Sequence, residues 1–363
     1  MLKRLREYLD RSVAPPASPI RGVWIANLPH SQALASPENI RQTLAFLQEI
    51  GFNTIFPVVW NRGYTLFPSD VMIDRGFPKI DPYFTEKNFD PLTILTECAR
   101  EFALEVIPWF EYGFAASHLE TGGHILTAYP AWAAIDSRGN RVKHGGLVWM
   151  NAFDREVQDF LLELVLEVAR NYDIKGVQGC DRFPALPVEG GYNPEVIARY
   201  QRETNPRTIP ASNDPRWVRW RADRLTDFLE RVYREIKAID PKLIVSLSPA
   251  VYPFCLNHLL QDPKAWIDRK IVDYLHPQIY RDSFSSYRAE ARKQKNFLFP
   301  NDSVKIAPGV AFTANGIDLD TGDIEKILDC NRRLGFDGQV FFHYEGLRKN
   351  SDRLAIAFRN FFG

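Results

Sequence analysis

The chain has 363 residues, 45% of them hydrophobic and 25% charged, which are ordinary values for a soluble globular protein. Its 45 Lys and Arg are balanced by 45 Asp and Glu, so it lacks the basic surplus that a general nucleic-acid-binding protein normally shows. No apolar run reaches the ~18 residues of a membrane span, and we expect no transmembrane helix.

Residues 1–20 are expected to form a short amphipathic helix followed by a Pro-rich linker. This segment is charged and has no apolar core of signal-peptide length, which predicts a cytoplasmic protein unless a leader has been lost. The cysteines form no CxxC pair and are expected to be buried thiols in a reducing compartment, at Cys98, Cys180, Cys255 and Cys330.

From residue 21 onward, short apolar runs alternate with longer amphipathic segments. In chain order, the predicted elements are strand 22–28, helix 36–50, strand 54–60, helix 91–102, strand 105–110, helix 156–172, strand 176–180, helix 217–239, strand 243–249, short helical turns near 254–267, strand 272–280, helix 286–295, strand 306–312, helix 323–334, strand 339–344 and helix 352–361. The strands are continuous apolar runs, as expected where both faces of a sheet are covered. Eight such repeats predict a single (β/α)8 TIM barrel over residues 21–363. A doubly wound open sheet is the competing fold, but no G-x-G-x-x-G motif follows the first strand.

The longest predicted connections follow strands two, three and four. They span residues 61–88, 112–151 and 183–214, the last with a short helix near 194–202. Long βα loops on the C-terminal side of a barrel are where such folds place a binding cleft.

Three acidic residues stand where predicted strands end. Asp181 follows the fourth strand, Glu111 the third and Glu345 the eighth. In a barrel these positions converge on one mouth, although an Asp after a strand can also cap the next turn. The same strand ends carry aromatic and polar side chains, namely Trp60, Arg62, Trp109, Tyr112, Arg182, His276, Gln278, Tyr280 and Tyr344.

This combination of side chains suits a carbohydrate. Flat indole and phenol rings stack on sugar rings, planar polar groups bind hydroxyls, and carboxylates supply the acid and the base or nucleophile for glycosidic cleavage. Arg62, Arg182 and Arg281 either pair with nearby carboxylates or bind an anionic substituent. We expect no cofactor.

Two other kinds of site were weighed. His276, His343, Asp181 and Glu111 could form a metal cluster, but the H-x-H spacing common in barrel metallohydrolases is absent, and we expect hydrogen-bonding histidines and no bound metal. The Gly-rich turns lack the trailing Lys-Ser/Thr of a phosphate-binding loop.

Four segments together resemble the glycosyl hydrolase-like family-ten barrels. They are R-G-V-W-I at 21–25, G-F-N-T-I at 51–55, N-Y-D-I-K-G-V-Q…D-R-F-P at 171–184 and H-P-Q-I-Y at 276–280. The resemblance covers roughly residues 21–345 and implies a barrel that hydrolyses glycans, including bacterial cell-wall strands. Asp181 falls on the family's strand-four aspartate, but Cys180 stands where many members have a second acidic residue.

The resemblance and the strand ends lead to one reading. We expect a glycoside hydrolase acting on a poly- or oligosaccharide, such as a cell-wall or N-acetylated glycan, with Asp181 as general acid and Glu111 or Glu345 as the second carboxylate. Strand seven ends without a carboxylate, so retaining, inverting and substrate-assisted mechanisms remain open; in the last, Tyr280 would hold an acetamido group. The alternatives are a non-catalytic glycan-binding barrel and a metal-dependent hydrolase. The sequence does not give the oligomeric state.

Overall fold

The protein is described by a computed structural model that covers residues 19–206, 208–298, 304–312, 316–349 and 352–362. The expected N-terminal helix lies outside these residues. Within them, no helix is both long enough and apolar enough to cross a membrane.

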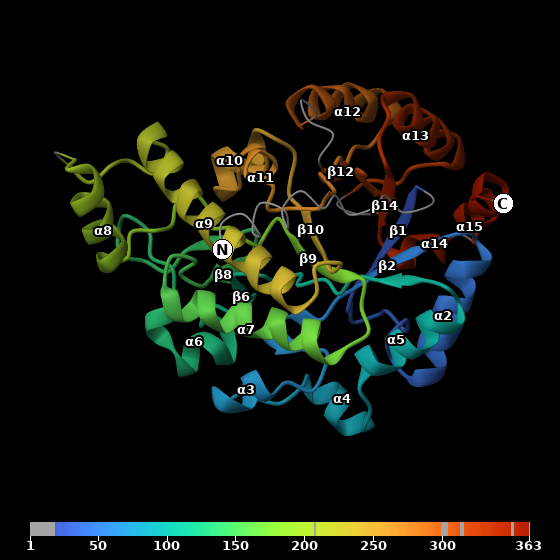
Figure 1. The fold of residues 1–363 in the computed structure, drawn as a ribbon, viewed down its shortest axis with the longest axis horizontal. Helices are drawn as coiled ribbons and strands as arrows, with labels where there is room; N and C mark the ends of the chain where they lie inside the picture. The colour runs from blue at the N-terminus through green and yellow to red at the C-terminus, as the bar shows by residue number, and fades with distance from the viewer. Residues whose placement is uncertain (1–18, 207, 299–303, 313–315, 350–351, 363) are drawn as a thin grey trace.

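Parallel strands occupy the centre of the molecule, with β1 and β14 side by side (Figure 1). Their ladders form two sheets, in the orders β13-β14-β1-β2-β5 and β12-β11-β10-β9. The strands are β1 (Ile20–Ile25), β2 (Thr54–Pro57), β5 (Glu105–Val106), β9 (Gly176–Cys180), β10 (Ile244–Ser248), β11 (Tyr274–Leu275), β12 (Lys305–Ile306), β13 (Gly309–Ala311) and β14 (Gly338–Phe342). β12 and β13 are two halves of the seventh strand position.

Prolines explain why these strands are short and how the two sheets connect. Because proline has no N–H to donate, it interrupts a ladder, and the predicted strands 54–60, 105–110 and 272–280 are reduced to β2, β5 and β11. The proline carbonyls still accept hydrogen bonds of 2.7–3.0 Å from the next strand position, at the pairs Pro57–Trp109, Pro108–Gln178, Pro249–Gln278, Pro277–Gly309 and Pro308–Val340. These bonds continue the ring between the sheets, and the fold is the expected (β/α)8 TIM barrel.

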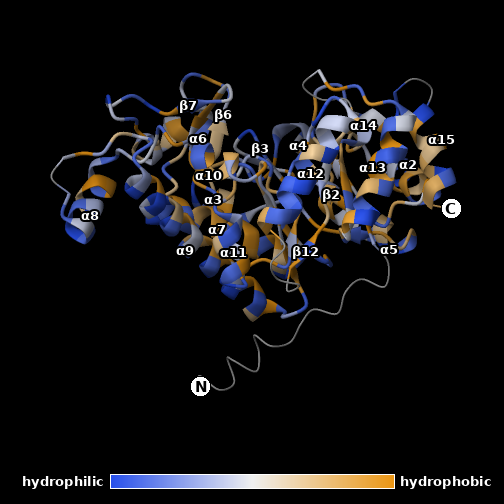
Figure 2. Ribbon diagram, turned by 90° about the horizontal axis from the view of Figure 1, so that it is seen from above, coloured by the Kyte–Doolittle hydropathy of each residue, from blue (hydrophilic) through white to orange (hydrophobic). Residues whose placement is uncertain are grey.

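Helices surround the strands, and Figure 2 shows hydrophilic and hydrophobic residues alternating along them, as expected for helices with one face on a core. α2 begins as predicted, with the Ser36 hydroxyl accepting from the Asn39 N–H at 3.2 Å and Pro37 in the first turn. The main outer helices are α2 (Pro37–Glu49), α5 (Pro91–Glu101), α7 (Arg155–Asn171), α9 (Pro215–Ile239), α12 (Phe284–Leu298), α13 (Thr321–Leu334) and α15 (Arg353–Phe362).

The connections after strands two, three and four are long, as expected, but they contain short elements. The first holds β3 (Trp60–Asn61), β4 (Tyr64–Thr65), α3 (Asp70–Asp74) and α4 (Pro82–Lys87). The second holds β6 (Ala115–Ser117), α6 (Gly123–Ala128), a 3-10 turn (Pro130–Trp132), β7 (Lys143–His144) and β8 (Leu147–Trp149). The third carries α8 (Pro194–Thr204), which lies at the opposite end of the molecule from α15 (Figures 1 and 2). Shorter helices elsewhere are α10 (Phe254–Leu259), α11 (Pro263–Asp268) and α14 (Tyr344–Leu347).

Candidate active site

An aromatic and amide cluster fills the barrel beneath its C-terminal mouth. The Trp24 indole N–H donates to the Gln178 side-chain oxygen at 2.6 Å, and the Gln178 amide donates to the Ser246 hydroxyl at 3.0 Å. The Trp24 ring centre lies 6.3 Å from that of Trp109 and 6.4 Å from that of His276. Strands one, three, four, five and six thus meet in one buried layer, which forms the floor of the mouth.

Two polar atoms in this floor have no hydrogen-bond partner among the described residues, namely Trp109 Nε1 and His276 Nε2. His276 is fully buried, and its Nδ1 donates to the Ala307 carbonyl at 2.8 Å, so Nε2 carries the lone pair. Burial lowers the pKa of His276 to about 4, which keeps the ring neutral near pH 7. Buried polar groups are normally paired, so this donor and this acceptor are exceptions within the floor.

Glu111 and Asp181 lie together at the ends of neighbouring strand positions. The Phe110 N–H donates to the Gln178 carbonyl at 2.8 Å and so fixes the strand-three end beside β9, which Asp181 follows directly. Burial raises the pKa of Glu111, the charge of Asp181 raises it further, and Arg182 and Asn61 partly oppose these effects. Glu111 and Asp181 thus follow neighbouring strand positions, and the charge of Asp181 acts on Glu111.

Arg182 and Cys180 hold the backbone of Glu111. The Arg182 Nε donates to the Glu111 carbonyl at 2.7 Å and the Cys180 thiol donates to it at 2.9 Å. A further Arg182 nitrogen lies 3.5 Å from the Glu111 carboxylate. Arg182 therefore pairs with a carboxylate, which was one of its two predicted roles.

Gly113 allows the loops after strands three and four to approach this closely. It has a φ of +48°, and a Cβ at this position would lie 2.1 Å from the Arg182 carbonyl oxygen. That carbonyl accepts from the Phe114 N–H at 2.9 Å. A glycine is therefore required where the two acidic loops touch.

The strand-two hairpin adds a third contact to Glu111. The Asn61 amide donates to the Glu111 carboxylate at 2.5 Å, and its oxygen accepts from Arg62 Nε at 2.7 Å. Arg62 is half-exposed and lies 3.4 Å from Asp81. Tyr112 is buried beneath Arg182, with its hydroxyl 2.5 Å from His118, and burial raises the pKa of Tyr112 to about 12.

Strand six brings Tyr280 and Gln278 to the same mouth. The Tyr280 ring stacks on Phe342, with 5.5 Å between ring centres. Burial raises the pKa of Tyr280, and so does the nearby charge of Asp181. The Gln278 amide donates to the Ser248 carbonyl at 2.8 Å.

One of the expected placements needs correction. Trp60 is fully buried, donates to the Gly113 carbonyl at 3.0 Å and packs against Phe160 of α7, so its ring faces the core and offers no platform to a sugar. The reason is that β2 ends at Pro57 and the chain turns into the β3–β4 hairpin. The hairpin directs the Trp60 ring away from the barrel interior and against α7.

Glu345 and Tyr344 follow β14, the eighth strand, as expected. They line a groove between α2 and α14, which we call the α2–α14 groove. The Glu345 carboxylate is bound by the Ser31 hydroxyl and by His343 Nδ1, the latter at 2.5 Å. Burial raises the pKa of Glu345, but these hydrogen bonds outweigh it and the net shift is downward.

Sequence reasoning missed Trp24 and Gln178 as parts of the site. Gln178 is a polar residue in the middle of an otherwise apolar strand, which was an available signal for an inward-facing function. Trp24 lies in the apolar run Val23–Ala26, and nothing in that run separates an inward ring from an outward one. No group of three or more His, Cys, Asp or Glu in the described residues is arranged to hold a metal ion.

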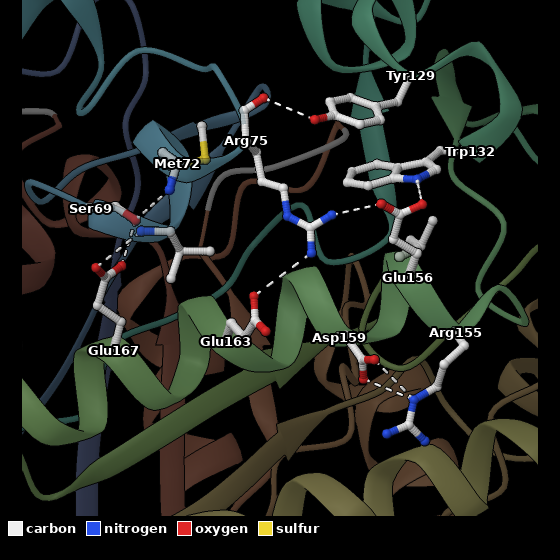
Figure 3. A network of polar contacts seen from close by, with 12 residues as sticks. Ser69, Met72, Arg75, Tyr129, Trp132, Arg155, Glu156, Asp159, Glu163 and Glu167 are labelled. Atoms are coloured by element: carbon white, nitrogen blue, oxygen red, sulfur yellow. Dashed lines mark hydrogen bonds and ion pairs between the residues drawn. The ribbon is translucent and has the colours of Figure 1, made fainter.

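A polar network fastens the loops after strands two and three to α7 (Figure 3). Arg75 pairs with Glu156 at 2.8 Å and lies 3.9 Å from Glu163, and its carbonyl accepts from the Tyr129 hydroxyl at 3.1 Å. Glu156 also accepts from the Trp132 indole at 3.0 Å. The two loops that carry Asn61 and Glu111 are therefore anchored on one barrel helix.

Glu167 makes a second anchor on the same helix. It accepts from the Ser69 hydroxyl at 2.5 Å and from the Asp70 N–H at 2.7 Å (Figure 3). Ser69 in turn accepts from the Met72 N–H. A carboxylate of α7 thus caps the start of α3.

The comparisons with known proteins agree with the resemblance noted in the sequence. A family model described as glycosyl hydrolase-like 10 matches residues 19–316. Glycosyl hydrolase DigH of Escherichia coli (strain K12) is 23% identical over 401 residues, covering 95% of this chain and 88% of DigH. Glycosyl hydrolase YngK of Bacillus subtilis (strain 168) is 24% identical, covering 72% of this chain and 54% of YngK.

Solved structures share the fold. The glycoside hydrolase domain of PgaB (BpsB) from Bordetella bronchiseptica superposes with a TM-score of 0.67 at 14% identity, covering 96% of this chain and 99% of that domain. The α-L-fucosidase isoenzyme 2 from Paenibacillus thiaminolyticus superposes with a TM-score of 0.65 at 15% identity, covering 94% of this chain and 48% of the fucosidase.

Proposed function

The chain belongs to the glycosyl hydrolase-like 10 family, and on this premise we propose that it is a glycoside hydrolase whose reacting groups are Glu111 and Asp181. The observation that carries the proposal is the meeting of these two carboxylates at the barrel mouth, above a floor with an unpaired donor and an unpaired acceptor. The proposed substrate is a poly- or oligosaccharide, such as a cell-wall or N-acetylated glycan.

Glu111 is the better candidate for the general acid, which reverses the roles expected from sequence. Cleavage needs a group that still holds a proton near neutral pH to protonate the leaving oxygen, and a second carboxylate that is ionised. Burial raises the pKa of Glu111 and so favours its protonated form. Pairs of carboxylates whose environments separate their pKa values are the usual basis for dividing acid and base roles.

Asp181 then acts on the anomeric carbon, either directly or through water. As a nucleophile it would give retention, at a carboxyl separation of about 5–5.5 Å, and as a base for water it would give inversion, at about 6.5–9.5 Å. The charge of Asp181 raises the pKa of Tyr280, so the two side chains share this part of the mouth. Tyr280 would orient the sugar, or the acetamido group of an N-acetylated sugar.

The floor of the mouth would bind sugar hydroxyls. Trp109 Nε1 can donate to a hydroxyl oxygen, and the neutral His276 Nε2 can accept from a hydroxyl. Arg182, Asn61 and Tyr112 would mainly position the acidic loops, because each contacts Glu111 or Arg182 directly. Gln278, Arg62 and Tyr280 remain the proposed rim contacts.

The test is a substrate screen with reducing-end detection. On any glycan that is cleaved, Asp181→Asn and Glu111→Gln are each expected to lower kcat at least ~100-fold, since a positioned acid or base contributes about 10²–10⁴. Asp173→Asn is the matched control, because Asp173 precedes the same strand at its other end, is 73% exposed and pairs with Arg100.

Two results would overturn the proposal. Undiminished turnover by Asp181→Asn would remove Asp181 from the reaction. Tight oligosaccharide binding with no product from the wild-type protein would instead support a non-catalytic glycan-binding barrel.

A further inference from the structure

The α2–α14 groove is an open hollow with both polar and apolar side chains in its wall, and the proposed cleavage does not use it. Its volume is about 470 Å³, within the range of small-ligand sites. Helix α2 contributes Asn39, Gln42 and Thr43 to its wall, and the segment after β14 contributes Tyr344 and Glu345.

A continuous series of side chains connects this groove with the mouth. The Tyr280 ring stacks on Phe342, and the charge of Asp181 raises the pKa of Tyr280. The Phe342 ring centre lies 4.9 Å from that of His343, and His343 binds Glu345 at 2.5 Å. This series joins Tyr280 at the mouth to Glu345 in the wall of the groove.

The wall of the groove has the hydrogen-bonding capacity that sugar hydroxyls need. Gln42 gives one N–H to Glu38 at 2.7 Å, and Asn39 gives one to the Gln32 carbonyl at 2.9 Å. A primary amide has two N–H groups and a carbonyl oxygen, so each keeps capacity for a ligand. Tyr344 adds a hydroxyl, which the Thr43 hydroxyl approaches at 3.4 Å.

Charge in the groove disfavours an anionic ligand. Hydrogen bonds from His343 and Ser31 lower the pKa of Glu345 against the effect of burial, so this carboxylate is ionised at neutral pH. The one arginine in the wall, Arg348, pairs with Asp352 at 2.9 Å and lies over the Phe46 ring, so its charge is already engaged.

We propose that the α2–α14 groove is a subsite that binds further uncharged sugar units of the same glycan whose neighbouring unit occupies the mouth. The inference rests on the proposed function and deepens it, since it makes Glu345 a hydroxyl-binding residue of this subsite. The subsite predicts a higher kcat/KM for longer chains than for shorter ones, and for chains of neutral sugars than for chains of uronic acids.

The experiment compares Gln42→Ala with Gln48→Ala on short and long oligosaccharides of one neutral glycan. Gln48 is the matched control, because it is an exposed glutamine on the same helix and does not line the groove. Gln42→Ala is expected to lower the ratio of kcat/KM for long over short chains about fivefold, as for loss of one hydrogen bond. Gln48→Ala is expected to leave this ratio unchanged.

Two readouts separate failure of this inference from failure of the proposed function. If the wild type cleaves the glycans but Gln42→Ala changes all chain lengths equally or not at all, the subsite is refuted and the hydrolase stands. If the wild type cleaves none, the proposed function fails, and calorimetric binding of the same chains still tests the groove. Weaker binding of long chains by Gln42→Ala alone would then support the subsite, and equal binding by both variants would refute it.

Discussion

At the scale of single residues, the surroundings of Glu111 define a test of its role. The Asn61 hydrogen bond stabilises the ionised form of Glu111 and therefore lowers its pKa, against the larger effect of burial. An acid must be protonated to act, so activity should fall as pH rises through this pKa.

Asn61→Ala is expected to move the alkaline limb of the kcat/KM profile upward by about 1 pH unit, the equivalent of one hydrogen bond to a charged group. Profiles of the wild type and variant over the same pH range measure this shift. An unmoved alkaline limb would show that Glu111 is not the titrating acid.

His276 gives a residue-scale prediction about stability. Its pKa is lowered from 6.5 to about 4 by burial, so the unfolded chain takes up a proton before the folded chain does as pH falls. The neutral ring therefore contributes stability that is fully present above pH 6.5 and is lost as pH falls from 6.5 to about 4.

In His276→Gln, the drop in unfolding free energy between pH 7.5 and 4.5 should be smaller than in the wild type by about 2–3 kcal/mol. Urea denaturation at the two pH values measures it, and the variant at pH 7.5 supplies its own reference for the cost of the substitution. Equal drops in both proteins would mean that His276 does not resist protonation.

At this scale, the sequence indicates that Asp181 and Glu111 follow neighbouring strand positions, but it does not indicate the direction of Trp60. Both acidic residues directly follow strand positions whose neighbours are fixed by parallel pairing, so their meeting follows from chain order. The direction of Trp60 depends on the β3–β4 hairpin, whose strands have only two residues each. Such short strands show no periodic pattern from which the direction of a side chain could be predicted.

At the scale of elements, the contact between α3 and α7 shows how the loop after strand two is attached to a barrel helix. α3 has only five residues and depends on Glu167 for the N–H groups at its start. Removing this carboxylate should release α3 without disturbing the barrel helix.

Glu167→Ala is expected to lower the free energy of unfolding by about 1 kcal/mol, as for loss of a helix cap, and to speed hydrogen exchange at Asp70 and Val71. Glu163→Ala is the matched control one turn earlier on α7, since Glu163 is 53% exposed and only 3.9 Å from Arg75. The control should change stability by less than about 0.5 kcal/mol. Equal exchange rates in both variants would contradict this role of Glu167.

Helices α2, α5, α7, α9 and α13 were predictable because each is long enough to show its period and begins at a side-chain N-cap. α2, α7 and α13 begin within two residues of the predicted positions. The strands β3, β4, β6, β7 and β8 are two or three residues long, and antiparallel pairing within loops leaves no periodic signal over so few positions.

At the scale of the whole molecule, closure of the barrel depends on how near its first and last strands approach. Gly338 has a φ of +127°, and a Cβ there would lie 2.1 Å from the Ile20 carbonyl oxygen. A side chain at this position must separate β14 from β1.

Gly338→Ala is expected to cost roughly 3 kcal/mol or more of unfolding free energy. Gly139→Ala is the control for backbone strain alone, because Gly139 has a φ of +83° with nothing within 4 Å, and it should cost about 1–2 kcal/mol. Chemical denaturation of the two variants measures the difference, and equal costs would mean that the β1–β14 contact can relax.

The alternation of eight strands and helices made the barrel predictable, because the hydrophobic pattern indicates the order of its elements, although prolines shorten several strands. The position of Glu345 was less predictable. Its strand end does reach the mouth side, but the groove that it lines is formed by α2 and α14, which only the packed fold brings together.

The central claim is that Glu111 and Asp181 act as one catalytic unit, and the most direct measurement is kcat of Asp181→Asn, Glu111→Gln and the double variant on a cleaved glycan. Residues that act as a unit are strongly non-additive, so each single variant should lose most of the activity and the double variant should be little worse than either. Losses that multiply in the double variant, or single variants with near wild-type kcat, would contradict the claim.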